Sequence, residues 1–578
     1  MSNNNPAENW DTTYDVVVVG SGAGAMTAAL RAYDLGLTVL LVEKSPHYGG
    51  TTAISGGGIW IPCNDQIQSL GGNDSYEEAV AYLRDVVGED FDLNRIHAYL
   101  KNGPEMVQYL ATRAQTHFHA VPRYPDYYPD RTGGKPGYRT MEPAAFDARR
   151  LGDVFDELRA PSPATLVGGR IALTQIEAHT IVAKESGWLG LLARLAFRYA
   201  TDLRWRCRTR RDRRLTLGNA LVASLRAALA HRSIPLWLNT PMRTLHAHDA
   251  RVTGVAVERQ GREYNVRARC AVVLACGGFE SSQEMRDQYL PKPTQAEWTA
   301  APPINTGDGI RAGLKIGASV SLMGYTWGVP TVRVPGEEKQ RGLFMERALP
   351  RCVLVNRLGR RFVNEAAPYP DIIHAMYADN AQTNANVPAW LVFDAEYRKR
   401  YPCGVLLPGS IQPDSRIPHG WLDSVIYRAG TLAELAKKIG VEPRGLATTV
   451  DQMNAYASIG TDHEFGKGGN IFDRYYGDII SKPNPCLGPI DRAPFYALRI
   501  DPGEIGTKGG LSTDAYARVL RPDGSVIEGC YAIGNTSAAV MGKTYPGPGS
   551  TIGPAMTFGY IAANHIAAEK INGSNPRP

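Results

Sequence analysis

The chain has 578 residues, more than one hydrophobic core usually serves, so we expect two domains. The formal net charge of +6 is small for this length and does not indicate a nucleic-acid partner. Eight cysteines are scattered without a CxxC pair, which argues against a zinc or iron–sulfur site and for a reducing compartment. We therefore expect an ordinary globular protein without a metal centre.

The N-terminal residues and the apolar runs of the sequence bear on where the protein is located. The first ten residues are polar and lack the basic-then-apolar order of a secretory signal. No apolar run reaches the roughly 18 residues that a membrane span needs. We expect a cytoplasmic protein, or one attached peripherally to the inner face of the membrane.

A dinucleotide-binding pattern opens the chain. Residues 14–20 form a β-branched run typical of a buried parallel strand, and Gly-Ser-Gly-Ala-Gly-Ala follows at 20–25. A helical pattern and a second strand ending at Glu43 complete the G-x-G-x-x-G/A fingerprint. Gly20 permits the tight turn, and Gly22 lets the backbone approach a pyrophosphate at the helix N-terminus. Glu43 is placed to accept hydrogen bonds from the adenosine ribose.

Four later segments indicate FAD rather than NAD. Residues 49–58, which are rich in Gly, Thr and Ser, resemble the second flavin-binding segment of the fumarate reductase-like flavoproteins. Residues 271–278 resemble the strand that returns to the adenine side of FAD, and residues 529–535 the strand that ends at the ribityl chain. Residues 551–555 begin a helix whose dipole can point at the flavin pyrimidine. The resemblance implies an α/β fold with a Rossmann-type FAD-binding domain.

The same resemblance implies a set of cofactor contacts. Gly50 stands where the covalent-flavin enzymes of the superfamily carry a tethering histidine, so we expect noncovalent FAD. The expected FAD-binding residues are Gly20, Ser21, Gly22, Ala23, Gly24, Ala25, Glu43, Lys44, Gly50, Thr51, Thr52, Ser55, Gly56, Gly57, Met242, Ala275, Cys276, Gly277, Asp308, Gly534, Asn535 and Ile552.

The order of these segments predicts a discontinuous FAD-binding domain. It would consist of residues 1–329 and 506–578, and an inserted α+β catalytic cap would span residues 330–505. No low-complexity linker marks these boundaries. A basic amphipathic insertion is expected within the first part, at residues 160–216.

One function open to this superfamily is dicarboxylate chemistry, as in fumarate reductase. Such enzymes need Arg and His side chains to hold two carboxylates. Arg360, Arg361 and His374 lie in the segment that would carry them. We favour the alternative that the arginines form a solvated or structural pair following a strand.

Tyrosine-bearing motifs point instead to the 3-ketosteroid Δ1-dehydrogenases. The resemblance is carried by residues 50–62, by Tyr-Pro-Asp-Tyr-Tyr-Pro at 124–129, by residues 359–369 and by Tyr-Pro-Gly-Pro-Gly-Ser at 545–550. It runs across most of the chain. It implies FAD-dependent 1,2-desaturation of a 3-ketosteroid in steroid degradation, an oxidoreductase reaction on a CH–CH bond.

The resemblance also implies roles for four residues. Tyr545 and the backbone amide of Gly549 would hold the C3 carbonyl oxygen of the substrate in an oxyanion-hole arrangement. Tyr369 would be the base for the C2 proton, with hydride from C1 passing to flavin N5. A free tyrosine has a pKa of about 10 and is a poor base near neutrality. A hydrogen bond from Tyr127 could favour the phenolate, although Tyr124 and Tyr128 compete for this position.

The insertion departs from shorter members of the family. An apolar helical face is predicted from Trp188, Leu191, Leu192, Leu195 and Tyr199. Arginines crowd the same and following turns: Arg194, Arg198, Arg204, Arg206, Arg208, Arg210, Arg211, Arg213 and Arg214. A basic amphipathic helix with an exposed Trp is typical of a peptide at a membrane surface, and a membrane quinone would suit as electron acceptor. The other interpretation is a helical hairpin packed on the FAD domain or at a subunit interface.

Two further functions stay open at this point. A 3-ketosteroid Δ4-(5α)-dehydrogenase shares the scaffold and would act at the C4–C5 bond. A flavin-binding redox sensor without turnover would bind FAD through the same motifs, but it would leave the spaced tyrosines without a purpose.

Overall fold

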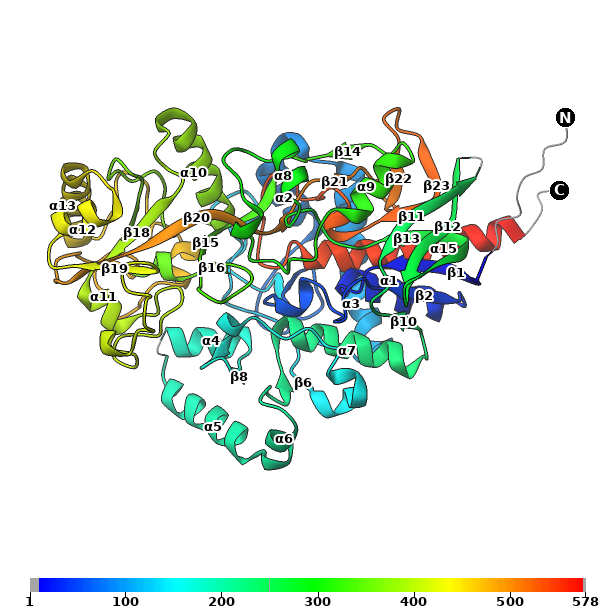
Figure 1. Ribbon diagram of the computed structural model, residues 1–578, viewed down its shortest axis with the longest axis horizontal. Coiled ribbons are helices and arrows are strands. Elements are labelled where there is room, and N and C mark those ends of the chain that lie inside the picture. The colour runs from blue at the N-terminus through cyan, green and yellow to red at the C-terminus, as the bar shows by residue number, and fades with distance from the viewer. Residues whose placement is uncertain (1–9, 184, 249, 575–578) are drawn as a thin grey trace.

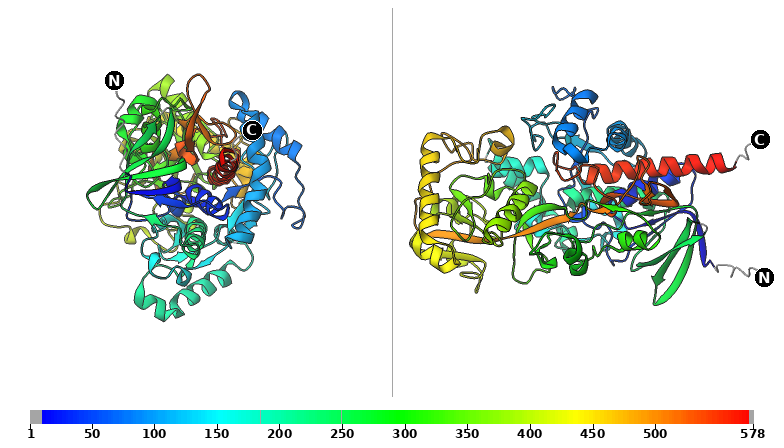
Figure 2. Two further views of the ribbon diagram at one scale, coloured as in Figure 1. Left: turned by 90° about the vertical axis from the view of Figure 1, so that its right-hand side faces the viewer. Right: turned by 90° about the horizontal axis from the view of Figure 1, so that it is seen from above.

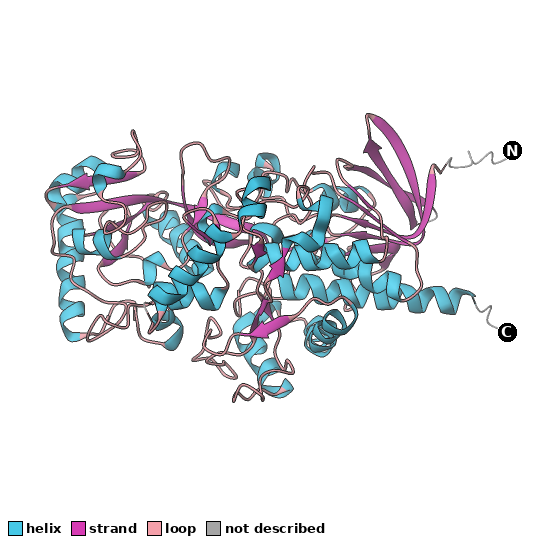
Figure 3. Cartoon of the chain, turned by 90° about the horizontal axis from the view of Figure 1, so that it is seen from below, coloured by secondary structure: helices cyan, strands magenta, loops and turns pink. Residues whose placement is uncertain are grey.

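The computed structural model describes residues 10–183, 185–248 and 250–574, and it places two β-sheets towards opposite ends of a long molecule (Figure 1; Figure 2). The first and last described segments of the chain lie beside the first sheet (Figure 1). Helices surround the sheets and fill the space between them (Figure 3).

The first sheet has eight strands, in the order β10-β2-β1-β13-β12-β23-β22, with β11 paired to β12. The strands are β1 (Thr12–Val19), β2 (Val39–Val42), β10 (Leu236–Trp237), β11 (Met242–His248), β12 (Arg251–Arg259), β13 (Arg262–Leu274), β22 (Arg518–Leu520) and β23 (Val526–Ala532). β1 pairs in parallel with β2 and β13, and β13 pairs in parallel with β23. The carboxyl ends of these strands therefore meet at one edge, as the dinucleotide fingerprint requires.

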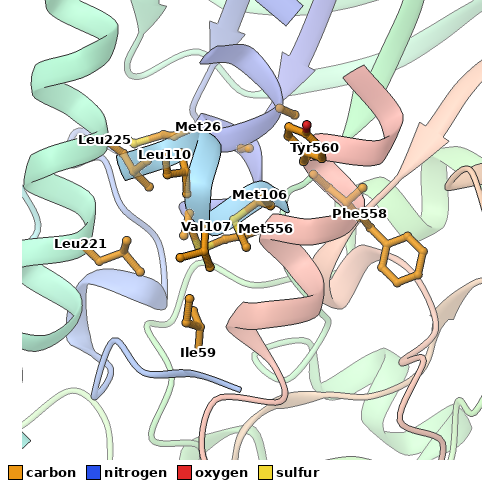
Figure 4. Close-up of a cluster of buried hydrophobic side chains, with 14 of the residues drawn as sticks. Met26, Ile59, Met106, Val107, Leu110, Leu221, Leu225, Met556, Phe558 and Tyr560 are labelled. Carbon is orange, nitrogen blue, oxygen red and sulfur yellow. The ribbon is translucent and has the colours of Figure 1, made fainter. Parts of the chain in front are cut away.

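The core beside this sheet is built from helices distant in sequence. They are α1 (Ala23–Asp34), α3 (Leu93–Arg113), α7 (Leu217–His231) and α15 (Ile552–Ser574). Met26, Met106, Leu221 and Met556, one from each helix, are all fully buried in one cluster (Figure 4). Small residues let α1 and α15 approach closely. A Cβ added to Gly24 would lie 2.6 Å from the carbonyl oxygen of Ala555, so the C-terminal helix is fixed directly on the fingerprint helix.

The second sheet has six strands, in the order β16-β15-β20-β18-β17, with β19 paired to β20. The strands are β15 (Thr326–Val332), β16 (Arg341–Gly342), β17 (Cys352–Val355), β18 (Ala389–Phe393), β19 (Ile426–Ala429) and β20 (Phe495–Thr507). Its strands pair antiparallel in the described structure. β15 leads into this sheet and β20 leads out of it, and the predicted boundaries at 330 and 505 fall within these two strands. The domain limits themselves stay a prediction.

Helices cover the second sheet on both sides. They are α10 (Tyr369–Thr383), α11 (Ala395–Arg400), α12 (Leu432–Ile439) and α13 (Pro443–Ile459). Two separate apolar clusters lie against the sheet, one including α10 and the other α12 and α13. β20, the long orange strand in Figure 1, runs from this sheet towards the centre of the molecule. The short helix α14 (Ile471–Tyr475) also lies between β19 and β20 in the sequence.

Smaller elements connect the two sheets. They are β3 (Ile59–Trp60), α2 (Tyr76–Val87), β4 (Phe118–Ala120), β5 (Thr140–Pro143), β6 (Phe146–Asp147), β9 (Arg214–Leu215), α8 (Gln283–Tyr289), α9 (Asp308–Lys315), β14 (Val320–Ser321) and β21 (Gly510–Leu511). The insertion contains β7 (Leu166–Val167), β8 (Ile171–Ala172), α4 (Gln175–Val182), α5 (Trp188–Thr201) and α6 (Leu203–Arg208). α5 and α6 lie at the lower edge of Figure 1, away from both sheets. Within the described ranges, no helix combines the length and the apolar character needed to cross a bilayer.

Candidate active site

The glycine turn after β1 makes close contacts that only glycine allows. Gly20 has a φ of +115°, and a Cβ there would lie 2.3 Å from the carbonyl oxygen of Ala275, at the end of β13. Gly22, which precedes α1, has more room, because the nearest atom to its added Cβ is Thr52 Oγ1 at 3.6 Å. The turn therefore joins two strand ends and leaves the backbone at Gly22 open to a ligand.

Ser21 and Glu43 form a buried pair at the ends of β1 and β2. The Ser21 hydroxyl donates to Glu43 Oε2 at 2.6 Å and accepts from the amide of Gly49 at 3.0 Å. The amide of Ser45 donates to the other Glu43 oxygen at 2.9 Å. Burial raises the pKa of Glu43. Each carboxylate oxygen keeps a further lone pair, so the site remains compatible with the predicted ribose contact.

Lys44 links the second strand to α9. Its ammonium group lies 2.7 Å from Asp308 Oδ2 and donates to Thr306 at 2.8 Å. Burial acts to raise the pKa of Asp308, but the hydrogen bonds from Lys44 and Thr306 outweigh it and hold the pKa below its ordinary value. Lys44 and Asp308, both predicted to bind FAD, therefore form an ion pair with each other.

The Thr-rich segment after β2 contacts the fingerprint and the region before α9. The Ala23 amide donates to Thr52 Oγ1 at 3.3 Å, and the Asn305 side chain donates to Thr51 Oγ1 at 2.8 Å. Gly50 has nothing nearer to its added Cβ than Gly22 Cα at 4.0 Å, and Gly56 has nothing within 4 Å. Gly57 differs, since its added Cβ would lie 2.4 Å from the amide nitrogen of Gly218. Packing against α7 thus explains why position 57 is glycine.

The C-terminal segments reach the same edge. Gly534 and Asn535 follow β23 after one intervening residue, Ile533, and Trp327 donates from its indole to Asn535 Oδ1 at 3.1 Å. A Cβ on Gly534 would lie 3.4 Å from Ala555, close to where Ile552 begins α15. Met242 is the first residue of β11 and is 8% exposed. Burial raises the pKa of Cys276 to about 11, so its thiol is not a reactive thiolate.

These five segments fit FAD on structural grounds. Part of the expected FAD-binding set is partly exposed: Gly22, Gly50, Thr51, Thr52, Ser55, Ala275, Cys276, Gly277, Gly534, Asn535 and Ile552. Another part is buried: Gly20, Ser21, Ala23, Gly24, Ala25, Glu43, Gly57 and Met242. Backbone amides at the N-terminus of a helix such as α1 suit a pyrophosphate. In the described part of the chain, no cluster of His, Cys, Asp and Glu suited to a metal ion occurs.

Three tyrosines from distant segments meet beyond the flavin-binding edge. Tyr127 lies in the loop after β4, Tyr369 is the first residue of α10, and Tyr545 lies in the loop before α15. The Tyr127 hydroxyl donates to the Tyr369 hydroxyl at 2.9 Å. The Tyr127 ring stacks on Tyr545 at 5.1 Å between centroids, and Tyr369 meets Tyr545 edge-on at 5.5 Å. We call these three residues the tyrosine centre.

Backbone contacts fix the tyrosine centre. The Tyr127 amide donates to the carbonyl of Pro546 at 2.9 Å, and the hydroxyl of Tyr82 donates to the same carbonyl at 2.6 Å. Gly549 has a φ of +99°, and a Cβ there would lie 2.6 Å from the Cα of Ile59. The 545–549 loop therefore packs directly on β3 and on the segment that carries Tyr127.

The electrostatics of the centre combine burial with mutual hydrogen bonding. The three side chains are buried, and burial raises the pKa of each hydroxyl above its ordinary value. For Tyr369, the hydrogen bond from Tyr127 opposes this rise and the hydrogen bond with Tyr545 adds to it, so that the pKa of Tyr369 stays well above its ordinary value. Hydrogen bonds from Thr551, Tyr369 and the Gly549 amide act in the same lowering sense on Tyr545. Tyr369 also begins a helix, where the helix dipole favours negative charge.

The structure separates the three competing tyrosines of the 124–129 segment. The Tyr124 hydroxyl lies 2.5 Å from that of Tyr476, and Tyr128 donates to Asp371 at 2.8 Å. Only Tyr127 of the three is hydrogen bonded to Tyr369 in the described structure. Sequence reasoning missed Asp371, although it stands two residues after Tyr369, in the first turn of the same helix.

The Arg360–Arg361 pair does not form a carboxylate-binding site. Arg361 is 7% exposed and pairs with Glu365 and Asp462, each at 2.8 Å. Arg360 is exposed. His374 lies on an exposed side of α10, with its ring edge-on to Tyr325. The structural interpretation of the arginine pair is therefore confirmed.

The predicted apolar face of the insertion turns towards the protein. Leu195 is 3% exposed, and Trp188, Leu191 and Leu192 are partly buried. Tyr199 is also partly buried and donates to the carbonyl of Arg210 at 2.8 Å. Trp188 is therefore only partly exposed, and α5 packs against α4 and β8 of the insertion. The choice between the membrane and the packing interpretation stays a prediction.

A different apolar face of the insertion is exposed. Leu189 is 63% exposed, Phe197 71% and Leu203 69%. Ala193 and Ala200 lie exposed between them. We call Leu189, Ala193, Phe197, Ala200 and Leu203 the outer face of the insertion.

Most arginines of the insertion have protein partners. Arg198 pairs with Asp212, Arg213 with Asp202, and Arg214 with Glu177. Others are exposed beside the outer face, and within the described residues no carboxylate pairs with them: Arg194, Arg204 and Arg210.

The insertion also contacts the surroundings of the tyrosine centre. His179 of α4 stacks on Tyr475 at 4.3 Å between ring centroids, and Tyr475 stacks on Tyr124 at 4.6 Å. The insertion is therefore joined to the segment that carries Tyr127.

Comparison with known proteins places the chain in a family. Residues 15–552 match the FAD binding domain family. A 3-oxosteroid 1-dehydrogenase of Mycobacterium tuberculosis is 45% identical over 570 residues, covering 96% of this chain and 98% of that protein.

Two solved structures extend the comparison. The 3-ketosteroid Δ1-dehydrogenase of Sterolibacterium denitrificans, in complex with 1,4-androstadiene-3,17-dione, superposes with a TM-score of 0.94 at 54% identity and covers 96% of this chain and 100% of its own. A 3-ketosteroid-Δ4-(5α)-dehydrogenase of Rhodococcus jostii shares the fold, with a TM-score of 0.65 at 20% identity and coverage of 97% and 98% of the two chains. This chain therefore belongs to the FAD-binding flavoproteins and, within them, to the 3-oxosteroid 1-dehydrogenase family.

Proposed function

We propose that this protein dehydrogenates 3-ketosteroids at the C1–C2 bond, with FAD as the immediate acceptor. The observation that carries the proposal is the tyrosine centre, in which a hydrogen-bonded pair, Tyr127 and Tyr369, faces Tyr545 in a buried setting. The full-length similarity to 3-oxosteroid 1-dehydrogenases supports the same reaction.

Carbonyl activation is the task of Tyr545 and Gly549. A hydrogen at C2 becomes acidic only when the neighbouring C3 carbonyl is polarised, because the charge left by the proton moves onto the carbonyl oxygen. The Tyr545 hydroxyl and the Gly549 amide already approach one another, as the hydrogen bond that lowers the Tyr545 pKa indicates. A ketone oxygen placed between them would accept from both, in the manner of an oxyanion hole.

Proton removal is the task of Tyr369. Its phenolate would take the C2 proton, and the hydrogen bond from Tyr127 would stabilise the negative charge before the substrate reacts. When bound, FAD supplies the acceptor for the hydride that leaves C1. Aromatic side chains around the centre, including Phe344, Phe472 and Trp327, would exclude water from the reacting carbons.

Anaerobic bleaching of the flavin tests this function. Mixing the holoenzyme with a 3-ketosteroid in the absence of oxygen should abolish the yellow absorbance, whereas succinate should leave it unchanged. Bleaching by succinate alone would overturn the proposal in favour of dicarboxylate chemistry. A flavin that responds to neither compound would favour a sensor without turnover.

The cofactor should be bound noncovalently. Gly50 has only a hydrogen where the tethered enzymes carry histidine, and its surroundings are open. Acid precipitation of the holoenzyme should therefore leave a colourless pellet and a yellow supernatant. A pellet that stays yellow would contradict this.

We also propose that the outer face of the insertion binds the inner surface of the membrane. Three large apolar side chains of α5 and α6 are exposed, and the same segment carries exposed arginines that have no carboxylate partner among the described residues, which suits a lipid surface carrying negative charge. The eight free thiols are consistent with a cytoplasmic protein. A membrane position would give access to apolar steroids and to a quinone as electron acceptor. Co-sedimentation with anionic vesicles that weakens with salt would support this, and failure to co-sediment at low salt would refute it.

A further inference from the structure

A buried lysine lies beside the loop that delivers Tyr545. Lys508 directly follows β20 and is fully buried. Within the described ranges, no carboxylate forms an ion pair with it. A buried charge without such a partner is costly, so the surrounding groups must compensate it.

The surroundings of Lys508 match a protonated amine. Its Nζ atom donates to the carbonyl of Gly542 at 3.2 Å and to the carbonyl of Thr544. It also lies 3.5 Å from the centre of the Trp327 ring, within the range of a cation–π contact. An ammonium group has three hydrogens for these three acceptors, whereas a neutral amine has two. Burial lowers the pKa of Lys508 well below its ordinary value, and the charges of Asp371 and Asp90 oppose this only in part.

Each of these contacts connects Lys508 to the neighbourhood of Tyr545. We call the Tyr545 hydroxyl and the Gly549 amide the oxyanion site. Thr544 immediately precedes Tyr545, so its carbonyl fixes the start of the loop. The Trp327 ring meets Tyr545 edge-on at 4.8 Å, and its indole holds Asn535 of the flavin-binding edge. The Lys508 Nζ atom itself lies 5.9 Å from the centre of the Tyr545 ring.

We propose that Lys508 is a positioning residue for the oxyanion site: it fixes Tyr545 and places a positive charge behind it. This rests on the proposed function. Removal of the C2 proton puts negative charge on the steroid C3 oxygen, next to the Tyr545 hydroxyl. A fixed positive charge in a water-poor site stabilises such charge more than the same group would in water. Lys508 would act through Tyr545, without touching the substrate.

A phenolic steroid provides a direct probe of that charge. In a fluorescent steroid whose A ring is part of a naphthol, the oxygen at C3 mimics the enolate when it ionises. Its apparent pKa, bound to the holoenzyme, should be lower than in water. In Lys508→Met the bound pKa should rise by about one unit, and bleaching by a 3-ketosteroid should slow on the order of tenfold, since one pKa unit corresponds to a tenfold change. A purely structural role would slow bleaching without moving the pKa of the bound phenol.

Lys543→Met is the matched control. Lys543 lies in the same loop, and its ammonium group is outside the buried site, near the Tyr325 ring. The Lys543→Met substitution removes one lysine charge from the loop, yet it should change neither the pKa of the bound phenol nor the bleaching rate.

The outcomes separate the two proposals. A Lys508→Met holoenzyme with the phenol pKa of the unaltered protein would overturn the role of the charge. If Lys508→Met fails to retain FAD, Lys508→Gln keeps a donor for one carbonyl and must show the same rise. A phenol pKa in the unaltered holoenzyme at or above its value in water would overturn the inference without any variant. Failure of the unaltered protein to bind any steroid would instead refute the proposed function, and the inference with it.

Discussion

The tyrosine centre and the insertion both carry aromatic residues and have charged residues beside them. The side chains of the centre are buried and hydrogen bonded to one another, whereas many side chains of the insertion are exposed. At the centre, Tyr127 donates to Tyr369, Tyr128 donates to Asp371, and all three site tyrosines are buried. On the insertion, Phe197 is 71% exposed and several arginines have no carboxylate partner among the described residues. The first region is complete within the fold, so its geometry serves internal chemistry. The second leaves large apolar and charged groups exposed, and the proposal that it binds a membrane accounts for them.

The strongest way to break this comparison is to remove the proposed base. Tyr369→Phe deletes the proton acceptor while keeping the ring that packs on Tyr545. A positioned base typically contributes about a hundred- to ten-thousandfold in rate, so ketosteroid bleaching of the flavin should slow by that order. Solvent deuterium exchange at C2 should also be lost. Bleaching at the unaltered rate would show that Tyr369 is not the base.

The oxyanion donor should have the next largest effect. Tyr545→Phe keeps the stacking with Tyr127 but loses one of the two donors to the C3 oxygen. Losing one such donor commonly costs on the order of a hundred- to a thousandfold in rate. Stopped-flow bleaching would measure it, with retained yellow colour as the control for folding. A loss confined to steroid affinity, with no change in the limiting bleaching rate, would argue against this role.

Tyr127→Phe should reduce activity less than the two substitutions above, and the reduction should depend on pH. The hydrogen bond from Tyr127 lowers the pKa of Tyr369, so its removal raises that pKa and reduces the phenolate fraction at a given pH. The rising limb of the pH–activity profile should therefore move to higher pH. Tyr124→Phe is the matched control, because its hydroxyl contacts Tyr476 instead, and it should leave the limb in place. Equal shifts in both variants would contradict the assignment of Tyr127.

Changes to the insertion should affect membrane binding and leave the tyrosine centre intact. The triple replacement of Leu189, Phe197 and Leu203 by Ser should release the protein from anionic vesicles, because it removes the exposed apolar groups. FAD content and bleaching rate should stay unchanged. Replacing Trp188, Leu192 and Leu195 by Ser is the contrasting variant, and it should lower thermal stability because it disrupts the inward-packed side. If only this second variant released the protein, the outer face would not be the lipid-binding surface.

The flavin-binding half of the fold could be predicted because its signals are local. The strand before Gly20, the turn and the acid at Glu43 follow one another within about one βαβ unit. The parallel pairing of β1 with β13 was not visible in the same way, but the glycines after each strand indicated a shared edge. The domain limits near 330 and 505 had no signal, because β15 and β20 continue through them.

The site could be predicted only in part. The resemblance gave Tyr127, Tyr369, Tyr545 and Gly549, and the structure brings the three tyrosines into contact. Lys508 and Asp371 escaped notice because burial and contacts with distant segments, such as Trp327 for Lys508 and Tyr128 for Asp371, cannot be read from residue spacing. The packing of the insertion was left open for a related reason. Its helix has apolar residues on two sides, and the residue spacing alone did not tell which side packs inward.

The central claim, dehydrogenation at C1–C2, is tested most directly by a single anaerobic turnover with androst-4-ene-3,17-dione. This steroid already has its double bond at C4, so an enzyme acting at the C4–C5 bond has nothing to remove. The account predicts a bleached flavin and one equivalent of product that has lost two hydrogens, one each from C1 and C2. An unbleached flavin with this steroid, together with bleaching by its 4,5-saturated analogue to give a C4–C5 double bond, would contradict it.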